Sequence, residues 1–154
     1  MFSVSNTTGY AILALSCLVQ TRGRWVLARD VATCTGIPHP YLLKILNQLS
    51  KLSIITTKPG YRGGFQLAKQ AHEITLWEIA TAFDGDTLLT KCLLGLEDCC
   101  DERSCPSHNY WSKERKQIEE ELKRLTLREA ADFEKVKGIR LSGCLCEPGE
   151  DSIV

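Results

Sequence analysis

The chain has 154 residues, of which 44% are hydrophobic and 25% are charged. These proportions are typical of a soluble globular protein and exclude a disordered, collagen-like or purely coiled-coil chain. The length accommodates one domain, or a small domain with a dimerising extension. The formal net charge is zero, with 19 basic and 19 acidic residues, and taken alone this balance argues against a nucleic-acid partner.

The zero net charge hides a segregation along the chain. Residues 1–75 contain eight basic and two acidic residues, a net charge of +6, and the remainder therefore carries −6. Such an asymmetry predicts an anionic partner for the first part of the chain only.

Neither a targeting signal nor a membrane span is evident. Residues 1–4 lack a basic region, and the apolar stretch 10–19 is too short to cross a bilayer. We therefore expect a cytoplasmic protein without a membrane partner. Because a cytosol keeps thiols reduced, the eight cysteines indicate a metal or redox centre more than a disulfide framework.

The first part of the chain predicts three helices. Ser5 and Asn6 suit the cap of a first helix, whose apolar residues recur every three or four positions. A short amphipathic helix over residues 27–35 is followed by Gly36, which suits a left-handed C-cap. The third helix begins at residues 38–40, because prolines fit only a first turn, and runs to about residue 52. The tight turn at Gly36 indicates a helix-turn-helix.

The third helix has one packing face and one basic, polar face. The expected packing face comprises Tyr41, Leu42, Ile45, Leu46, Leu49 and Leu52. The polar face comprises His39, Lys44, Gln48 and Lys51. A basic face without acidic residues makes this helix a candidate for entry into a major groove.

A hairpin is expected directly after the third helix. Residues 54–58 and 65–67 form two strand-like segments, and the turn-forming residues 59–64 lie between them. The tip displays Lys58, Tyr61 and Arg62. The predicted fold is therefore mainly α with a small β-hairpin, a winged helix-turn-helix domain followed by a long dimerisation helix.

Charge, basic helix and wing agree on double-stranded DNA as the partner. The alternative is a small helical domain whose basic residues are merely solvated. Candidates for contacts with phosphates and groove walls are Lys44, Lys51, Lys58 and Arg62. Candidates for contacts near base edges are His39, Tyr41 and Gln48, although Tyr41 equally suits half-buried packing, and Pro40 and Tyr61 complete the candidate set.

The second part of the chain divides into four stretches. Thr75 and Glu78 form a capping box for a helix to residue 83, which would close a DNA-binding domain of residues 1–83. A cysteine-rich loop is expected over residues 84–108, a dimerisation region over 109–141 and a flexible tail over 142–154.

The dimerisation region begins with a long charged helix, expected from residue 109 to about 127. Its apolar stripe of Ile118, Leu122 and Leu125 is narrow. A narrow stripe suits a seam with a second copy of the chain. We therefore expect a homodimer.

The cysteine loop carries a candidate metal centre made of Cys92, Cys99, Cys105 and His108. Three thiolates and one imidazole on one loop can turn toward a common centre, whereas four surface cysteines with no role would be an oxidation liability. Cys100 is an alternative ligand, because the sequence alone does not choose between the adjacent thiols Cys99 and Cys100.

An iron–sulfur cluster is the favoured occupant, with 2Fe-2S preferred to 4Fe-4S, and structural zinc is the alternative. Structural zinc sites usually contain a cysteine pair two to four residues apart, and the gaps between Cys92, Cys99 and Cys105 are wider. A cysteine followed by proline, as at Cys105, recurs in cluster loops. Cys144 and Cys146 have a metal-like spacing but no assigned role.

The sequence resembles the winged-helix transcription regulators typified by the iron–sulfur regulator IscR and the nitric-oxide-sensing repressor NsrR. Residues 8–11, 36–46 and 60–68 carry the resemblance, with the cysteine loop leading into Tyr110 and Trp111. The resemblance implies a regulator of transcription and not an enzyme. It also implies that this regulator binds a palindromic operator as a homodimer. The expected signal is iron, redox state or nitric oxide.

The resemblance also implies that Cys92, Cys99, Cys105 and His108 hold the cluster. Two departures limit the transfer. The first cysteine gap is six residues where five is usual, so the alternative ligand Cys100 stays open. The glutamate that affects operator choice corresponds here to Leu43, so the operator sequence does not follow. The remaining alternative is a winged-helix regulator stabilised by zinc, without a redox cluster.

Overall fold

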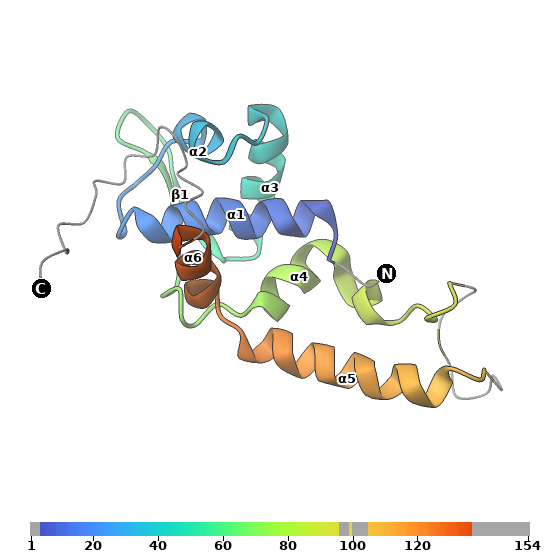
Figure 1. The fold of residues 1–154 in the computed structure, drawn as a ribbon. Coiled ribbons are helices and arrows are strands. Elements are labelled where there is room, and N and C mark those ends of the chain that lie inside the picture. Colours follow the sequence, from blue (N-terminus) through green and yellow to red (C-terminus); the bar gives the residue numbers. More distant parts are fainter. Residues whose placement is uncertain (1–3, 96–98, 100–104, 137–154) are drawn as a thin grey trace, which may run out of the picture.

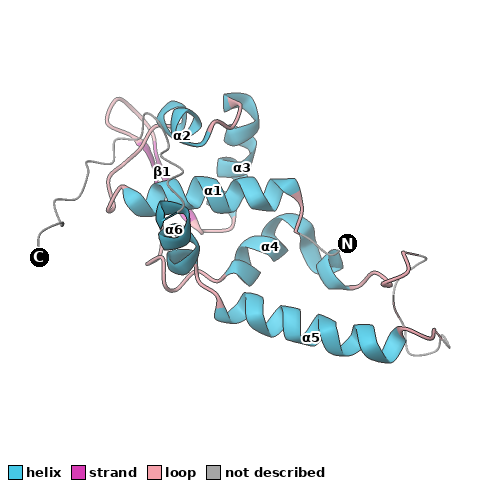
Figure 2. Ribbon diagram, in the orientation of Figure 1, coloured by secondary structure: helices cyan, strands magenta, loops and turns pink. Residues whose placement is uncertain are grey.

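The computed structural model describes residues 4–95, 99 and 105–136. Cys100, Cys144, Cys146 and the expected tail over 142–154 lie outside these residues. The elements, in chain order, are α1 (Asn6–Gln20), α2 (Ala28–Thr35), α3 (His39–Lys51), β1 (Ile55–Lys58), β2 (Gly64–Leu67), α4 (Leu76–Asp84), the 3-10 helix η1 (Gly85–Leu89), α5 (His108–Arg124) and α6 (Leu127–Val136). The predominance of helices beside one hairpin (Figure 2) confirms the predicted fold class.

Helix α1 lies at the centre of the molecule (Figure 1) and contacts α2, α3, α4, α6 and β2. Its N-terminus is capped by Ser5, whose hydroxyl accepts a hydrogen bond from the backbone N–H of Thr8. Its core face buries Ala14, Leu15 and Leu18 almost completely. Burial of one such leucine stabilises the fold by about 1.5–3 kcal/mol, so this helix is the main organiser of the core.

The helix-turn-helix forms where the sequence predicts it. Gly36 ends α2 in the left-handed conformation with φ 71°, and its N–H reaches the carbonyl of Ala32 at 2.8 Å. Pro38 precedes α3 as its N-cap residue and the packing face buries Leu42, Ile45, Leu46 and Leu49. The expectation for Leu52 is wrong, because this residue follows the helix end and is 48% exposed.

The wing is an antiparallel pair of strands, β1 and β2, with Ile55 opposite Leu67 and Lys58 opposite Gly64. Val26, between α1 and α2, adds a further antiparallel bridge to Phe65, with backbone N–O distances of 2.7 and 3.1 Å. Gly64 has φ 142°, and a Cβ atom there would collide with the carbonyl oxygen of Val26. A glycine is therefore required for the wing to lie this close to the loop before α2.

The predicted capping of α4 is confirmed on its Thr75 side, because the Thr75 hydroxyl accepts a hydrogen bond from the Glu78 N–H at 3.1 Å. The Glu78 carboxylate instead pairs with Lys69 at 2.8 Å. After Asp84 the chain continues through η1 into the cysteine loop. The 3-10 helix was not predicted from the sequence.

The prediction of one helix from residue 109 to about 127 is wrong at its end. Helix α5 ends at Arg124, and α6 begins at Leu127 and packs against α1. Thr126 and Glu129 form a capping box, in which the Glu129 carboxylate accepts from the Thr126 N–H at 2.9 Å and the Thr126 hydroxyl accepts from the Glu129 N–H at 3.4 Å. This cap begins a new helix after Arg124, and Leu127 at its start lies in the core.

No helix among the described residues combines the length and the apolar character needed to cross a membrane.

Candidate nucleic-acid interface and cysteine loop

The N-terminal end and outer face of α3 present the predicted polar side chains. His39, Pro40, Lys44 and Lys51 are all exposed. Lys44 and Lys51 are seven residues apart and therefore lie on the same side of α3. The structure therefore brings the predicted phosphate contacts of this helix, Lys44 and Lys51, together on a surface that a nucleic acid can reach.

Two other candidates on α3 have partners within the protein. The Tyr41 hydroxyl lies 2.7 Å from the Thr7 hydroxyl, and its half-buried ring meets that of Tyr10 edge to face with centroids 5.8 Å apart. The Gln48 amide donates a hydrogen bond to the carbonyl of Ala82 at the end of α4. Tyr41 therefore joins α3 to α1, and Gln48 joins α3 to α4.

The wing carries the second group of candidates. Tyr61 at the tip is 98% exposed, and Lys58 and Arg62 are exposed beside it. Gly63 packs so closely on the carbonyl of Lys58 that a Cβ atom would clash with it. The Lys58 ammonium lies 5.8 Å from the ring centroid of Trp25, a cation–π distance. The tip is thus a tight turn whose cationic side chains point outward.

The electrostatics of this surface are one-sided. Between Asp30 and Glu73 the sequence contains no acidic residue, and Asp30 lies 3.6 Å from Arg29. Helix α3 and the wing both fall within that stretch. Segments that contribute cations and no carboxylates of their own fit the phosphate backbone of a duplex.

The cysteine loop is tied to α5 at its base. The Trp111 indole N–H donates to the carbonyl of Lys91 at 2.8 Å, and the Arg115 guanidinium donates to the carbonyl of Leu89 at 3.1 Å. The Cys99 N–H returns to the carbonyl of Thr90 at 2.8 Å. These bonds hold Cys92, Cys99 and Cys105, all half-buried thiols, near the N-terminal end of α5.

The predicted ligands make close contacts within the cysteine loop and the start of α5. The Cys99 sulfur is 3.2 Å from Nδ1 of His108. The Cys105 sulfur is 3.2 Å from the Ser107 hydroxyl, and hydrogen bonds from Ser107, with a smaller contribution from Cys92, lower the pKa of the Cys105 thiol. Of the four predicted ligands, Cys99 and His108 therefore face each other, and Cys92 approaches Cys105, whose sulfur also meets Ser107. The described residues contain no preformed group of three or more metal-binding side chains.

The donor set fits an iron–sulfur cluster chemically. Thiolates are the usual ligands of iron–sulfur clusters and imidazole replaces them in some, and a lowered thiol pKa favours the thiolate that binds metal. The alternative ligand Cys100 lies outside the described residues.

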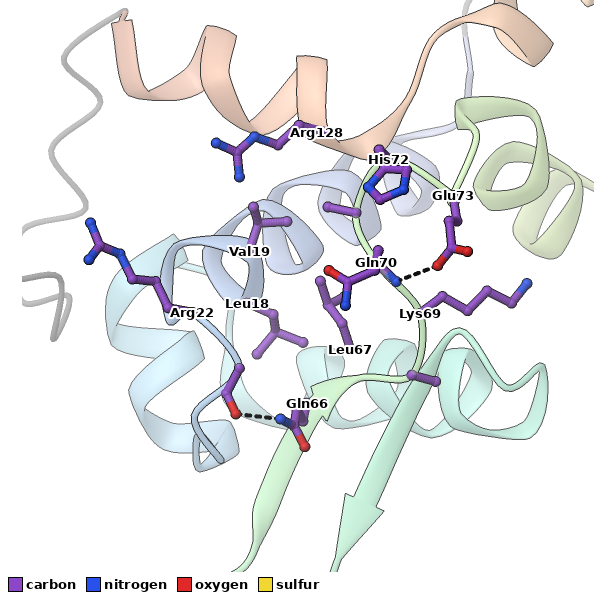
Figure 3. A pocket seen from close by; sticks show the side chains of 13 residues that line it. Leu18, Val19, Arg22, Gln66, Leu67, Lys69, Gln70, His72, Glu73 and Arg128 are labelled. Atoms are coloured by element: carbon purple, nitrogen blue, oxygen red, sulfur yellow. Dashed lines mark hydrogen bonds between the residues drawn. The ribbon is translucent and has the colours of Figure 1, made fainter.

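A pocket of about 550 Å³ lies away from the cysteine loop, between the end of α1, the chain after β2 and the start of α6 (Figure 3). Charged side chains line it, but several of them are engaged. Lys69 pairs with Glu78, Arg128 pairs with Asp132 at 3.1 Å, and Glu73 accepts a hydrogen bond from the Gln70 N–H. The lining therefore presents no converging set of charges for a ligand.

Comparison with known proteins decides the class of the molecule. Residues 4–132 match the Rrf2 family, described as an iron-dependent transcriptional regulator. The chain belongs to the Rrf2 family.

Relatives of this Rrf2 protein are named as transcriptional regulators of the helix-turn-helix type. An HTH-type protein of Aquifex aeolicus is 33% identical over 85% of this chain and 92% of its own length. The HTH-type transcriptional regulator IscR of Vibrio campbellii is 29% identical over 78% of this chain and 71% of its own. The family confirms the prediction of a DNA-binding regulator of transcription and not an enzyme.

Solved structures show the same architecture for the Rrf2 protein. CymR, the global cysteine regulator of B. subtilis, has a TM-score of 0.73 at 18% identity, covering 86% of this chain and 98% of that one. IscR of T. potens has a TM-score of 0.66 at 25% identity, covering 88% and 90%.

Sequence reasoning missed three contacts that organise the site. Asp84 joins the end of α4 to α1, and Thr7 joins α1 to α3. Trp25 joins the loop between α1 and α2 to the wing. Only Trp25 left a signal, as an aromatic residue next to the basic turn at Arg22 and Arg24.

Proposed function

We propose that this Rrf2-family regulator is a cytoplasmic homodimer that binds a palindromic operator and senses iron, redox state or nitric oxide through an iron–sulfur cluster. Cys92, Cys99, Cys105 and His108 would hold the cluster. The observation that carries this proposal is the 3.2 Å approach of the Cys99 sulfur to Nδ1 of His108 on a loop that also carries Cys92 and Cys105. The names of its IscR relatives support the same assignment.

The occupant would contribute electron-transfer and ligand-exchange chemistry. The protein's part is to position the donors and limit their access to solvent. Hydrogen bonds from Ser107 lower the pKa of the Cys105 thiol. The hydrogen bonds from Trp111 and Arg115 fix the base of the loop. We favour a 2Fe-2S cluster and retain 4Fe-4S as the second type.

A chain of contacts leads from the cysteine loop to α3, the recognition helix of the proposed DNA complex. The loop begins after α4, and the end of α4 contacts α3 through the hydrogen bond from Gln48 to the Ala82 carbonyl. Two residues later Asp84 accepts hydrogen bonds from Ser5 and Thr8 at the start of α1, and the neighbouring Thr7 bonds to Tyr41 of α3. A change in the loop can therefore reach α3 from two sides, a local event with a distant readout.

The homodimer is supported by the position of α5. This helix lies on the side of the molecule opposite α2 and α3 (Figure 1) and packs on α4, where the Lys123 ammonium lies 5.3 Å from the Trp77 ring centroid. Its apolar residues Ile118 and Leu122 remain only half-buried in one chain. A second copy along this stripe would cover them and leave both recognition helices facing away from the seam.

Anaerobic purification followed by metal analysis tests the cluster directly. We expect iron and inorganic sulfide in the wild-type protein, with visible absorption, and loss of all three in Cys99→Ala. Cys34→Ala is the matched control, because Cys34 is buried in the helix-turn-helix core and should leave the metal content unchanged. Zinc without iron and sulfide would establish the alternative, a zinc-stabilised winged-helix regulator.

A further inference from the structure

The loop between α1 and α2 lies against the wing and carries two arginines outside the expected DNA contacts. Arg22 and Arg24 are both exposed. The Gln66 amide of β2 donates a hydrogen bond to the carbonyl of Gly23 between them. At the end of the loop, Val26 is paired with Phe65 of the same strand through two backbone hydrogen bonds.

This loop is held in one conformation by several independent features. The Thr21 hydroxyl is buried and donates to the carbonyl of Leu18 at 2.7 Å. Arg22 has φ 52°, a left-handed conformation that a long side chain rarely adopts without a reason. The Arg24 guanidinium lies 3.4 Å from the Thr21 carbonyl. The two arginines therefore sit on a fixed turn.

Trp25 connects this turn to the cations of the wing. Trp25 is 37% exposed, and the Lys58 ammonium lies 5.8 Å from the centroid of its ring. The loop that carries both arginines therefore adjoins the wing, and the Arg22 side chain borders the pocket at the end of α1 (Figure 3). No acidic residue precedes Asp30 in the sequence, so nothing in this first stretch of chain offsets their charge.

We propose that residues 21–25 form a third element of the DNA-binding surface, in which Arg22 and Arg24 bind backbone phosphates beyond those reached by α3 and the wing tip. Arginine binds phosphate through planar, multiple N–H donors, and a fixed turn loses little conformational freedom on binding. These contacts would add affinity and position the wing without reading base sequence. The inference rests on DNA binding by this regulator and is independent of the cluster.

The test compares Arg22→Ala/Arg24→Ala with a control of equal charge, Lys113→Ala/Lys116→Ala, on α5. Both control lysines are exposed, and α5 lies opposite α2 and α3 (Figure 1). The probe is a fluorescent random-sequence duplex titrated at several KCl concentrations. Each phosphate contact contributes about 0.9 to the slope of log K against log salt. We expect Arg22→Ala/Arg24→Ala to lower the slope by about 1.8 and the affinity by roughly an order of magnitude or more. We expect Lys113→Ala/Lys116→Ala to keep the slope and the affinity of the wild-type protein.

Two further measurements separate the possible outcomes. In the wild-type protein, phenylglyoxal should modify Arg22 and Arg24 more slowly when duplex is bound, whereas Arg124, paired with Glu121 on α5, should react at the same rate. Arg22→Lys/Arg24→Lys should retain most of the salt slope. Equal salt slopes for Arg22→Ala/Arg24→Ala and the control Lys113→Ala/Lys116→Ala would overturn this inference alone. Equal rates of Arg22 and Arg24 modification with and without duplex would do the same. Failure of the wild-type protein to bind duplex would also overturn the DNA-binding proposal.

Discussion

Asp84 at the end of α4 accepts a hydrogen bond from the hydroxyl of Thr8 in α1 at 3.0 Å. The same carboxylate oxygen accepts one from the backbone N–H of Ser5, also at 3.0 Å. Residues that are more than seventy positions apart are therefore joined where the cysteine loop leaves the core. These two hydrogen bonds, the Asp84 clasp, join the start of α1 to the end of α4.

Asp84→Ala should destabilise the protein by about 1.5 kcal/mol, because it removes two hydrogen bonds to a charged group. Chemical denaturation measures this difference. Asp132→Ala removes an exposed ion pair with Arg128 and should cost less than about 0.5 kcal/mol. Equal stabilities of the two variants would show that the Asp84 clasp contributes nothing.

Tyr41→Phe should lower stability by about 1 kcal/mol, because it removes the hydrogen bond to Thr7 and keeps the ring contact with Tyr10. Thermal or urea unfolding detects the loss. Tyr61→Phe is the matched control, since Tyr61 is 98% exposed and its hydroxyl has no partner to lose among the described residues. If Tyr41→Phe is as stable as the wild-type protein, the contact between the Tyr41 and Thr7 hydroxyls does not help to hold α1 against α3.

Lys58→Ala and Arg62→Ala should each weaken binding to duplex DNA and lower the salt slope by about 0.9. Both side chains project from the wing, where phosphates are the expected contacts. Fluorescence anisotropy at several KCl concentrations provides the slopes. An affinity that is indifferent to salt in the wild-type protein would contradict the electrostatic interface as a whole.

Thr126→Ala should cost about 1 kcal/mol by removing the cap of α6. The Thr126 N–H and hydroxyl lower the pKa of Glu129. Because the folded-state pKa lies below the unfolded value, this stabilisation is present above the unfolded pKa and is lost as pH falls through the folded pKa. Glu129→Gln should therefore flatten the dependence of stability on pH in that acidic range. An unchanged pH profile would refute the role of the carboxylate.

The elements with local signals could be predicted from the sequence. Gly36 and Thr75 mark helix ends through backbone requirements that act within a few residues, and the strand segments alternate with a turn-forming stretch. The end of α5 was missed because apolar spacing continues past Arg124, while the deciding Thr126–Glu129 cap competes with that spacing. Local propensity alone does not decide such a competition.

The candidate site was predictable in composition but not in detail. The set of basic residues on α3 and the wing followed from charge and helical spacing. The inward contacts of Tyr41 and Gln48, with Thr7 and Ala82, depend on how α1 and α4 pack against α3. The approach of Cys99 to His108 depends on the path of a loop, which the spacing of cysteines does not determine.

The most direct test of the central claim is DNA affinity measured anaerobically on one preparation before and after removal of its iron. Operator fragments are first selected from a random-sequence pool with the iron-loaded protein. We predict a large change in affinity for these fragments on iron removal, abolished in Cys99→Ala and retained in Cys34→Ala. Identical affinities of the iron-loaded and iron-free wild-type protein would contradict a cysteine loop that controls DNA binding.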